Sequence, residues 1–106
     1  MNALTTKLAG VTFGECQQNI QLFGNAPELG VGEYELLREP KNPHDQNAVR
    51  VCFGNFSLGY LPENIAKTVA PEMDAGTNLV AKFVSLNRSS YHDPVGLTVK
   101  IVQVEN

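Results

Sequence analysis

The segment from Arg38 to Ala48 constrains the fold of this chain more than any other stretch. It reads Arg-Glu-Pro-Lys-Asn-Pro-His-Asp-Gln-Asn-Ala and lies between two apolar runs. Proline fixes φ, and asparagine and aspartate side chains satisfy nearby backbone groups, so such a segment can hardly continue a strand or a helix. We therefore predict a rigid turn in which Asn42 and Asp45 close hydrogen bonds with the backbone.

Strands are predicted on both sides of this turn. Residues Glu33 to Glu39 alternate between apolar and charged side chains, as expected for a strand with one face in water. After the turn, Val49 to Phe53 and Phe56 to Tyr60 suit two strands. Gly54-Asn55 between them suits a hairpin turn.

A helix is predicted directly after the hairpin, at about residues 62–75. Pro62 suits the first turn of a helix, where the missing N–H is not needed. Pro71 removes an N–H further along, so we expect the helix to end near Ala70 and a short second turn to follow. The predicted inward-facing stripe consists of Ile65, Val69 and Met73.

The remaining elements are predicted from alternation and helical spacing. We expect Met1 to Thr6 to be frayed, Lys7 to Phe13 to form a strand, and Glu15 to Phe23 to form a short helix. Two further strands are predicted at Asn78 to Leu86 and Val95 to Val104. Five or six strands with short helices predict a mainly β fold of the α+β type and favour a small barrel, which would bury the sheet edges.

Length and composition indicate one domain that spans residues 1–106, with a core from about 7 to 104. Of the 106 residues, 42 % are apolar and 18 % are charged, as in a globular protein. No apolar run is long enough to cross a membrane or to serve as a signal peptide, so we expect a soluble, cytoplasmic protein.

Cysteine usage and charge limit the chemistry further. Cys16 and Cys52 form no C-x-x-C pair, which favours free, buried thiols over a zinc site or a disulfide. The net charge is −3, and the 8 Lys and Arg residues are scattered without a basic run. A nucleic-acid ligand would therefore be held through few phosphates, because Lys and Arg supply most non-specific affinity.

Several spaced motifs, in order along the chain, resemble the HIRAN domain. They are Ala9 to Phe13, Arg38-Glu39-Pro40, Asn42 to Asp45, Asn47-Ala48-Val49, Leu58 to Pro62 and Ile65-Ala66. The resemblance covers most of positions 8–76; the family includes the front module of the helicase-like transcription factor and small standalone bacterial and phage proteins. It implies a compact β-barrel related to OB and SH3-like folds that binds single-stranded DNA at a free 3′ end.

The resemblance also implies a role for the turn. In the family the matching loop meets the terminal nucleotide, which would place Asp45 against the 3′-hydroxyl, with Asn42 and His44 in the same loop. A carboxylate accepts a hydrogen bond from a hydroxyl and repels a phosphate, so it would distinguish a free end from a phosphorylated or continuous strand. From spacing alone, Asn42 and Asp45 are turn-closing residues and His44 is an exposed loop residue.

Aromatic rings are the next candidates for contacts with DNA. Phe13 and His44 offer flat faces for a base or a sugar, although a core position for Phe13 is an equal alternative. The hydroxyl of Tyr60 and the helix start after it could hold a phosphate, or Tyr60 could pack on the barrel rim. Tyr91 lies in the polar loop between the last two predicted strands and is a stacking candidate by its position.

Two positions depart from the pattern of the helicase-like transcription factor. Thr12 stands where that protein has an arginine before the aromatic residue, and Glu63 stands where it has a lysine. These departures put two phosphate contacts in question, at Thr12 and at Glu63. Arg38 or Lys41 would have to replace them, so we expect weaker and more salt-sensitive binding.

Catalytic and metal-binding alternatives depend on two His-Asp pairs and one cysteine. His44-Asp45 and His92-Asp93 could hold a metal if the fold brought both loops together, and Cys52 with His44 could form a nucleophilic pair. The sequence contains no P-loop and no zinc ligand set. We therefore expect a binding module that is not an enzyme and needs no cofactor and no metal.

The predicted function is recognition of the free 3′-hydroxyl end of single-stranded DNA, in DNA repair or at replication forks. The expected partners are this DNA and a helicase or other repair protein, with no membrane, and the protein would be nucleoid-associated when DNA-bound. Two other classes stay open. One is an adaptor domain with the same fold and little DNA affinity, and the other is a small hydrolase or nuclease that uses the His-Asp pairs.

Overall fold

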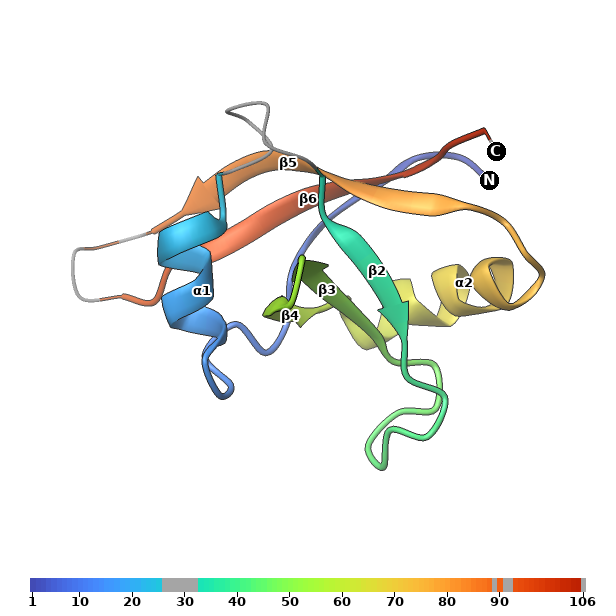
Figure 1. The fold of residues 1–106 in the computed structure, drawn as a ribbon, viewed down its shortest axis with the longest axis horizontal. Helices are drawn as coiled ribbons and strands as arrows, with labels where there is room; N and C mark the ends of the chain where they lie inside the picture. The colour runs from blue at the N-terminus through green and yellow to red at the C-terminus, as the bar shows by residue number, and fades with distance from the viewer. Residues whose placement is uncertain (26–32, 89, 91–92, 106) are drawn as a thin grey trace.

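The computed structural model of this chain describes residues 1–25, 33–88, 90 and 93–105. Within these residues the chain forms six strands and two α-helices (Figure 1). In chain order they are β1 (Leu4–Lys7), α1 (Cys16–Phe23), β2 (Glu35–Arg38), β3 (Val49–Phe53), β4 (Phe56–Tyr60), α2 (Glu63–Asp74), β5 (Leu79–Asn87) and β6 (Gly96–Gln103). The mainly β class with short helices is therefore confirmed, as are the predicted hairpin and the helix at about 62–75.

The described strands form two antiparallel, three-stranded sheets, with the orders β1-β6-β5 and β2-β3-β4. The sheets meet at two isolated bridges, Ala9 with Tyr60 and Tyr34 with Ala81. Within the described residues no continuous ladder joins the two sheets, so they do not close into a complete barrel. At the first bridge the reason is local, because Gly10, with a φ of +65°, turns the chain directly after Ala9.

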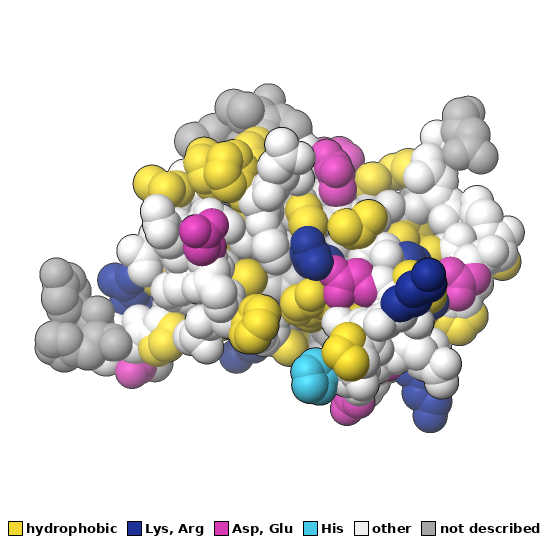
Figure 2. Space-filling view, turned by 60° about the horizontal axis from the view of Figure 1, so that its bottom comes forward, with side chains coloured by type: hydrophobic (Ala, Val, Ile, Leu, Met, Phe, Trp, Pro, Cys, Tyr) yellow, Lys and Arg dark blue, Asp and Glu magenta, His cyan; other side chains and the backbone are white. Residues whose placement is uncertain are grey.

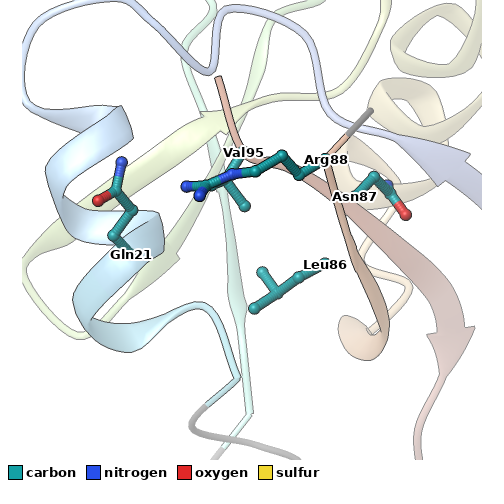
Figure 3. A pocket seen from close by; sticks show the side chains of 5 residues that line it. All are labelled: Gln21, Leu86, Asn87, Arg88 and Val95. Carbon is teal, nitrogen blue, oxygen red and sulfur yellow. The ribbon is translucent and has the colours of Figure 1, made fainter. Parts of the chain in front are cut away.

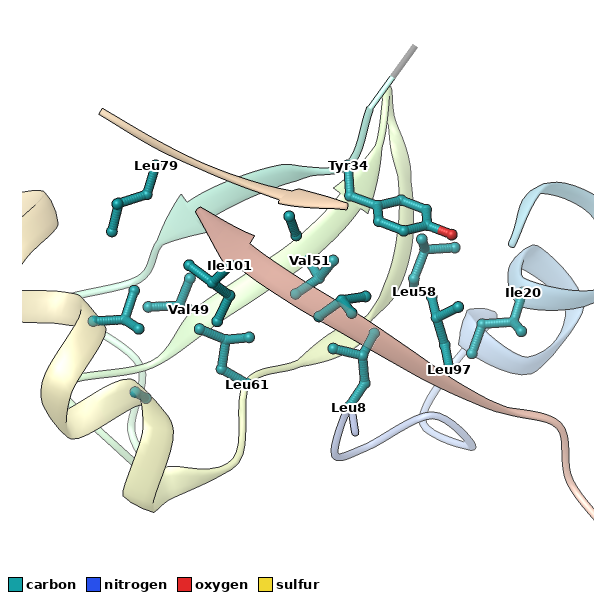
Figure 4. Close-up of a cluster of buried hydrophobic side chains, with 14 of the residues drawn as sticks. Leu8, Ile20, Tyr34, Val49, Val51, Leu58, Leu61, Leu79, Leu97 and Ile101 are labelled. Atoms are coloured by element: carbon teal, nitrogen blue, oxygen red, sulfur yellow. The ribbon is translucent and has the colours of Figure 1, made fainter. Parts of the chain in front are cut away.

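The two sheets and both helices enclose one hydrophobic core (Figure 4). The predicted alternation of β6 is confirmed, since every second residue from Leu97 to Ile101 is buried. Both cysteines, Cys16 and Cys52, are buried free thiols, as predicted. The largest fully buried side chains are Tyr34, Ile20, Leu58, Leu97, Ile101, Val49, Val51, Val69 and Val99. This packing fixes β3 and β4, from which the candidate site is built.

The N-terminal strand lies earlier than predicted. β1 pairs with β6, from Leu4 opposite Ile101 to Lys7 opposite Thr98, so the predictions of a frayed start and of a strand at 7–13 are wrong. In β1, half-buried and exposed positions alternate, which suits an edge strand. The segment after Ala9 forms turns instead of a strand.

Helix α2 continues through Pro71 to Asp74, so the predicted interruption near Ala70 is wrong. Proline removes the hydrogen bond to the carbonyl group one turn earlier, which belongs to Lys67. Both residues are exposed, so water can satisfy that carbonyl group. The helix buries Ala66, Val69 and Ala70, and the predicted Ile65 and Met73 pack against the core while partly buried. Of the described helices, none is long and apolar enough to cross a membrane.

The two ends of the described chain lie side by side, because β1 and β6 are neighbours (Figure 1). The N-terminal ammonium group of Met1 donates a hydrogen bond to Oε1 of Gln103 at 2.8 Å. The β2–β3 loop, by contrast, extends away from both sheets (Figure 1). The candidate site is built around this loop.

Replacing Gly59 by alanine should destabilise the junction between the sheets. Gly59 adopts a φ of +150°, and a Cβ atom there would lie 2.7 Å from the carbonyl oxygen of Ala9. Backbone strain and overpacking each cost about 1–3 kcal/mol, so we expect the free energy of unfolding to fall by about 2–6 kcal/mol. Chemical denaturation measures this loss.

The matched control is Gly54→Ala. Gly54 also has a positive φ, but a Cβ atom there would meet nothing within 4 Å. This change should cost about 1–2 kcal/mol, because only the backbone conformation is penalised. Equal losses in the two variants would contradict the importance of the contact with Ala9.

Candidate functional site

The β2–β3 loop is held in shape by its own polar side chains. Oδ1 of Asn42 accepts hydrogen bonds from the N–H groups of His44 (2.9 Å) and Asp45 (3.3 Å). Oδ1 of Asp45 accepts a hydrogen bond from the N–H group of Asn47 at 2.8 Å. Both residues therefore close turn hydrogen bonds, as predicted.

Arg38 fixes the base of this loop. Its Nη1 atom donates hydrogen bonds to the carbonyl oxygens of Gln46 (3.1 Å) and Ala48 (3.0 Å). Its Nε and Nη2 atoms donate to the carboxylate of Asp74, at the end of α2, at 2.9 and 3.1 Å. Most of the guanidinium donors are thus used inside the protein. A direct contact between Arg38 and a phosphate stays a prediction.

The loop forms one wall of a groove of about 540 Å³, which we call the Asp45 groove. This volume lies in the usual range for ligand sites. Sequence analysis selected five of its lining residues, and the fold brings them together: Phe13, Asn42, His44, Asp45 and Tyr60. Ala9, Gly10, Pro43, Ala48, Leu61 and Glu63 complete the lining.

Phe13 is 74 % exposed, so it is not the core residue that the alternative reading proposed. It lies in the turn before α1, where its N–H group donates to the carbonyl oxygen of Gly10 at 3.0 Å. A large aromatic side chain that is this exposed loses little packing if it is removed. Its ring is available to stack on a flat ligand.

The carboxylate of Glu39 joins the loop to the hairpin. Oε1 of Glu39 accepts hydrogen bonds from Nδ2 of Asn42 and from the hydroxyl group of Tyr60, both at 2.9 Å. Oε2 forms an ion pair with Arg50 of β3, whose guanidinium group lies 5.9 Å from the centre of the Tyr60 ring. Burial alone would raise the pKa of Glu39, but these hydrogen bonds and the charge of Arg50 outweigh it and lower the pKa.

Tyr60 is oriented by the same contacts. Burial raises the pKa of its hydroxyl group most and the hydrogen bond to Glu39 adds to this, and together they outweigh Arg50, which lowers that pKa. Because this hydroxyl donates to Glu39, its proton already has an acceptor inside the protein and is not held ready for a phosphate. The ring of Tyr60 remains part of the groove lining.

Sequence reasoning missed Glu39 and Arg50. The alternation of β3 places Arg50 on the side opposite the buried Val49 and Val51, which is a signal that it is accessible. Its partners were not visible, because they depend on the register that sets Arg50 opposite Tyr60 in the hairpin. Pairing partners of this kind follow from the tertiary structure alone.

The other predicted residues lie outside the groove lining. Thr12 and Lys41 are exposed next to lining residues. Tyr91 lies outside the described residues. Helix α2 begins at Glu63, which lines the groove, and no described side chain caps the helix. The N–H group of Ile65 in its first turn already donates to the carbonyl oxygen of Pro62 at 2.9 Å.

The catalytic and metal-binding alternatives find little support in the geometry. Burial raises the pKa of the Cys52 thiol, which disfavours the thiolate form that a nucleophile needs. Across the part of the chain that the structure describes, no three His, Cys, Asp or Glu side chains are grouped so that they could hold a metal ion. His92, of the second His-Asp pair, lies outside that part.

A separate pocket lies between α1 and the ends of β5 and β6 (Figure 3). It is lined by Gln21, Leu86, Asn87, Arg88 and Val95. Arg88 extends toward α1 in this view (Figure 3). The pocket contains none of the residues that sequence analysis selected, so the Asp45 groove is the stronger candidate.

Comparison with known proteins identifies the family. The family model of the HIRAN domain matches residues 13–103. This chain belongs to the HIRAN domain family. The crystal structure of the HIRAN domain of human HLTF has a similar fold, with a TM-score of 0.66 over 96 % of this chain and 74 % of that chain. The two sequences are 16 % identical, so this likeness concerns the fold.

Two larger proteins share part of the sequence of this HIRAN domain. The Fanconi-associated nuclease 1 homolog of Arabidopsis thaliana is 39 % identical over 54 residues, which are 49 % of this chain and 6 % of that protein. The homolog of Oryza sativa subsp. japonica is 42 % identical over 43 residues, which are 37 % of this chain and 4 % of that protein. The matched segments are thus a small part of these relatives.

Replacing Glu39 by glutamine should destabilise the protein at pH 7 by about 1–2 kcal/mol, because the amide loses the pairing with Arg50 and a good acceptor for Tyr60. The pKa of Glu39 lies below its ordinary value of 4.5 in the folded state, so its stabilisation is present above pH 4.5. That stabilisation is lost as the pH falls through the lowered pKa of Glu39 in the folded protein. Denaturation at several pH values should therefore show the two proteins converging below pH 4.5.

The control for this series is Glu105→Gln, which removes an exposed carboxylate at the end of the described chain. It should change the free energy of unfolding little at any pH. If the difference in free energy of unfolding between wild-type protein and Glu39→Gln grew as the pH fell, the stabilising role of the ionised Glu39 would be contradicted.

Proposed function

We propose that this HIRAN domain binds single-stranded DNA and captures its free 3′-hydroxyl end in the Asp45 groove. One observation supports this proposal above all: a carboxylate, the ring of the exposed Phe13 and the ring of Tyr60 line the same groove. A nucleoside presents a hydroxyl group and a flat base, and the groove offers a partner for each.

Asp45 has capacity for a ligand hydroxyl in addition to its role in the loop. A carboxylate has two oxygen atoms with about four acceptor positions, and the turn uses Oδ1 for one N–H group. Among the described residues, no hydrogen bond to Oδ2 is found within the protein. A hydroxyl bound there would receive a charge-assisted hydrogen bond.

The charge of the groove favours an end without a phosphate. Its lining includes the carboxylates of Asp45 and Glu63, and no described Lys or Arg is part of it. On the face shown in Figure 2, basic and acidic side chains are interspersed and form no single-sign patch. A terminal phosphate would be repelled by both carboxylates, whereas a hydroxyl would not.

The wider role that we propose is recognition of DNA ends during repair or replication-fork processing. The similarity to a segment of Fanconi-associated nuclease 1 homologs supports this context. The domain acts as a binding module, and any cutting or unwinding would be done by another domain or by a helicase or repair protein that it joins. Single-stranded DNA with a 3′-hydroxyl is its proposed partner.

A second candidate function is an adaptor domain that binds protein and has little DNA affinity. It is favoured by the absence of a described Lys or Arg from the lining of the Asp45 groove. The hydrogen bond to Asp74 raises the pKa of Arg38 most, and the charge of the nearby Asp45 raises it further. The donors of Arg38 are used by Asp74 and the loop. Absence of binding to any oligonucleotide would select this second function.

The decisive variant for end recognition is Asp45→Asn. Its amide oxygen can still accept the N–H group of Asn47, so the loop should keep its shape. Loss of the charge should weaken binding of a 3′-hydroxyl oligonucleotide about tenfold and strengthen binding of the 3′-phosphate form. Fluorescence anisotropy with two oligonucleotides that differ at the 3′ end measures both effects.

Glu105→Gln serves again as the control, because it removes one negative charge away from the groove. It should leave the preference for the hydroxyl end unchanged. Wild-type protein that bound the two oligonucleotides equally would refute end recognition.

Phe13→Ala should weaken binding of the 3′-hydroxyl oligonucleotide by about 5- to 150-fold, the range expected for one base stacked on an aromatic ring. Because Phe13 is 74 % exposed, the thermal unfolding temperature should hardly change. Leu22→Ala is a matched control, since Leu22 is 61 % exposed on α1 and lines no groove described here. Unchanged affinity in Phe13→Ala would exclude stacking on this ring.

A further inference from the structure

We propose a second nucleotide subsite next to the Asp45 groove, in which Arg50 binds the phosphate between the last two nucleotides of the strand. This inference depends on the proposed function, because it needs the 3′ end to occupy the Asp45 groove. It assigns Arg50 a role in binding and sets the direction in which the strand leaves the groove.

The subsite is a second hollow of about 370 Å³, which we call the Arg50 hollow. Phe13 and Tyr60 line both this hollow and the Asp45 groove, so the two spaces share these walls. Arg50, Phe56 and Glu15 belong to the Arg50 hollow alone. A strand that has its last nucleotide in the Asp45 groove can therefore pass the two shared rings and enter the Arg50 hollow.

Charge decides which way the strand runs. The Asp45 groove has two carboxylates in its lining, and the Arg50 hollow has one carboxylate, of Glu15, and one guanidinium group. Among the described residues, Arg50 is the one Lys or Arg side chain that lines either space. The first phosphate on the 5′ side of the terminal nucleoside is thus stabilised most on the side of Arg50.

Arg50 can bind a phosphate without leaving its partners. Its side chain is 38 % exposed, whereas that of Glu39 is 17 % exposed, so the ion pair presents its positive member to solvent. Glu39 is bound through Nη2, and a guanidinium group has five N–H donors. The contact with the Tyr60 ring and the bond to Glu39 hold the group in place, which lowers the entropy lost on binding.

The Arg50 hollow is also lined by an aromatic ring, that of Phe56. Phe56 is 44 % exposed, and its ring stacks on Phe23 of α1 with a centroid separation of 4.4 Å. An exposed ring and a cation that line one hollow are the combination that single-strand binding proteins use for base and phosphate. The hollow therefore fits the nucleotide that precedes the 3′ end.

The test is a double-mutant cycle between Arg50 and the last internucleotide linkage. Wild-type and Arg50→Gln proteins are titrated with a short oligothymidylate whose last linkage is either a phosphate or an uncharged methylphosphonate. We expect the uncharged linkage to weaken the wild-type complex about tenfold and to have little further effect on Arg50→Gln. The slope of log affinity against log salt should fall by about 0.7 in the variant.

Two controls make the result specific. Moving the methylphosphonate to the 5′ end should remove the coupling with Arg50, and Arg50→Lys should recover part of the affinity because it keeps the charge. Lys82→Gln removes an exposed charge on β5 and should show no coupling to the last linkage. Thermal unfolding of each variant establishes that it is folded.

Each outcome separates this inference from the proposed function. If wild-type protein prefers the 3′-hydroxyl end but Arg50→Gln responds to the uncharged linkage as wild type does, the subsite is refuted and end capture stands. If Arg50→Gln loses the preference for the hydroxyl over the 3′-phosphate, Arg50 acts through Glu39 on the groove, and the subsite is also refuted. If wild-type protein binds no oligonucleotide, both proposals fail.

Discussion

The candidate site depends on one carboxylate, that of Glu39. It accepts hydrogen bonds from Asn42 in the β2–β3 loop and from Tyr60 at the end of β4, and it pairs with Arg50 of β3. A half-buried carboxylate is costly unless donors surround it, and here three groups offset that cost. Because these groups come from the loop and from both strands of the hairpin, the shared acceptor fixes the loop relative to the hairpin. Tyr60, which this carboxylate holds through a hydrogen bond, lines both the Asp45 groove and the Arg50 hollow.

Much of the fold could be predicted from the sequence, because the residues that determine it act on their neighbours. The Pro, Asn and Asp residues of the loop close hydrogen bonds two or three positions away, and Gly54-Asn55 turns the hairpin directly. Alternation in β6 and helical spacing in α1 and α2 are likewise local patterns. These local patterns do not predict that Phe13 lies near the loop, because about thirty positions separate the two in the sequence. The resemblance to the HIRAN family supplied that part, and local patterns alone would not have done so.

The errors of the sequence analysis have a common physical cause, which is that tertiary contacts outweighed local rules. Leu4–Lys7 has a weak strand pattern, but β6 offers it a partner edge, and pairing stabilises it. Pro71 remains helical because the bond that it breaks lies on the exposed side, while Val69 and Ala70 beside it are buried. The two sheets do not close into a complete barrel. At one of their bridges, Gly10 turns the chain directly after Ala9 pairs with Tyr60. Arg50 was passed over because a charged residue at an outward strand position is common, and its partners follow from the hairpin register.

The two ends of the described chain lie close together, which suits insertion of this domain into a larger protein. Met1 contacts Gln103, and neither residue lines the Asp45 groove or the Arg50 hollow. Domains whose termini meet at the surface can be inserted into a host protein with little distortion of either partner. A polypeptide attached at either end, or at both, would therefore leave the Asp45 groove open. The same fold could thus be part of proteins of very different size and architecture.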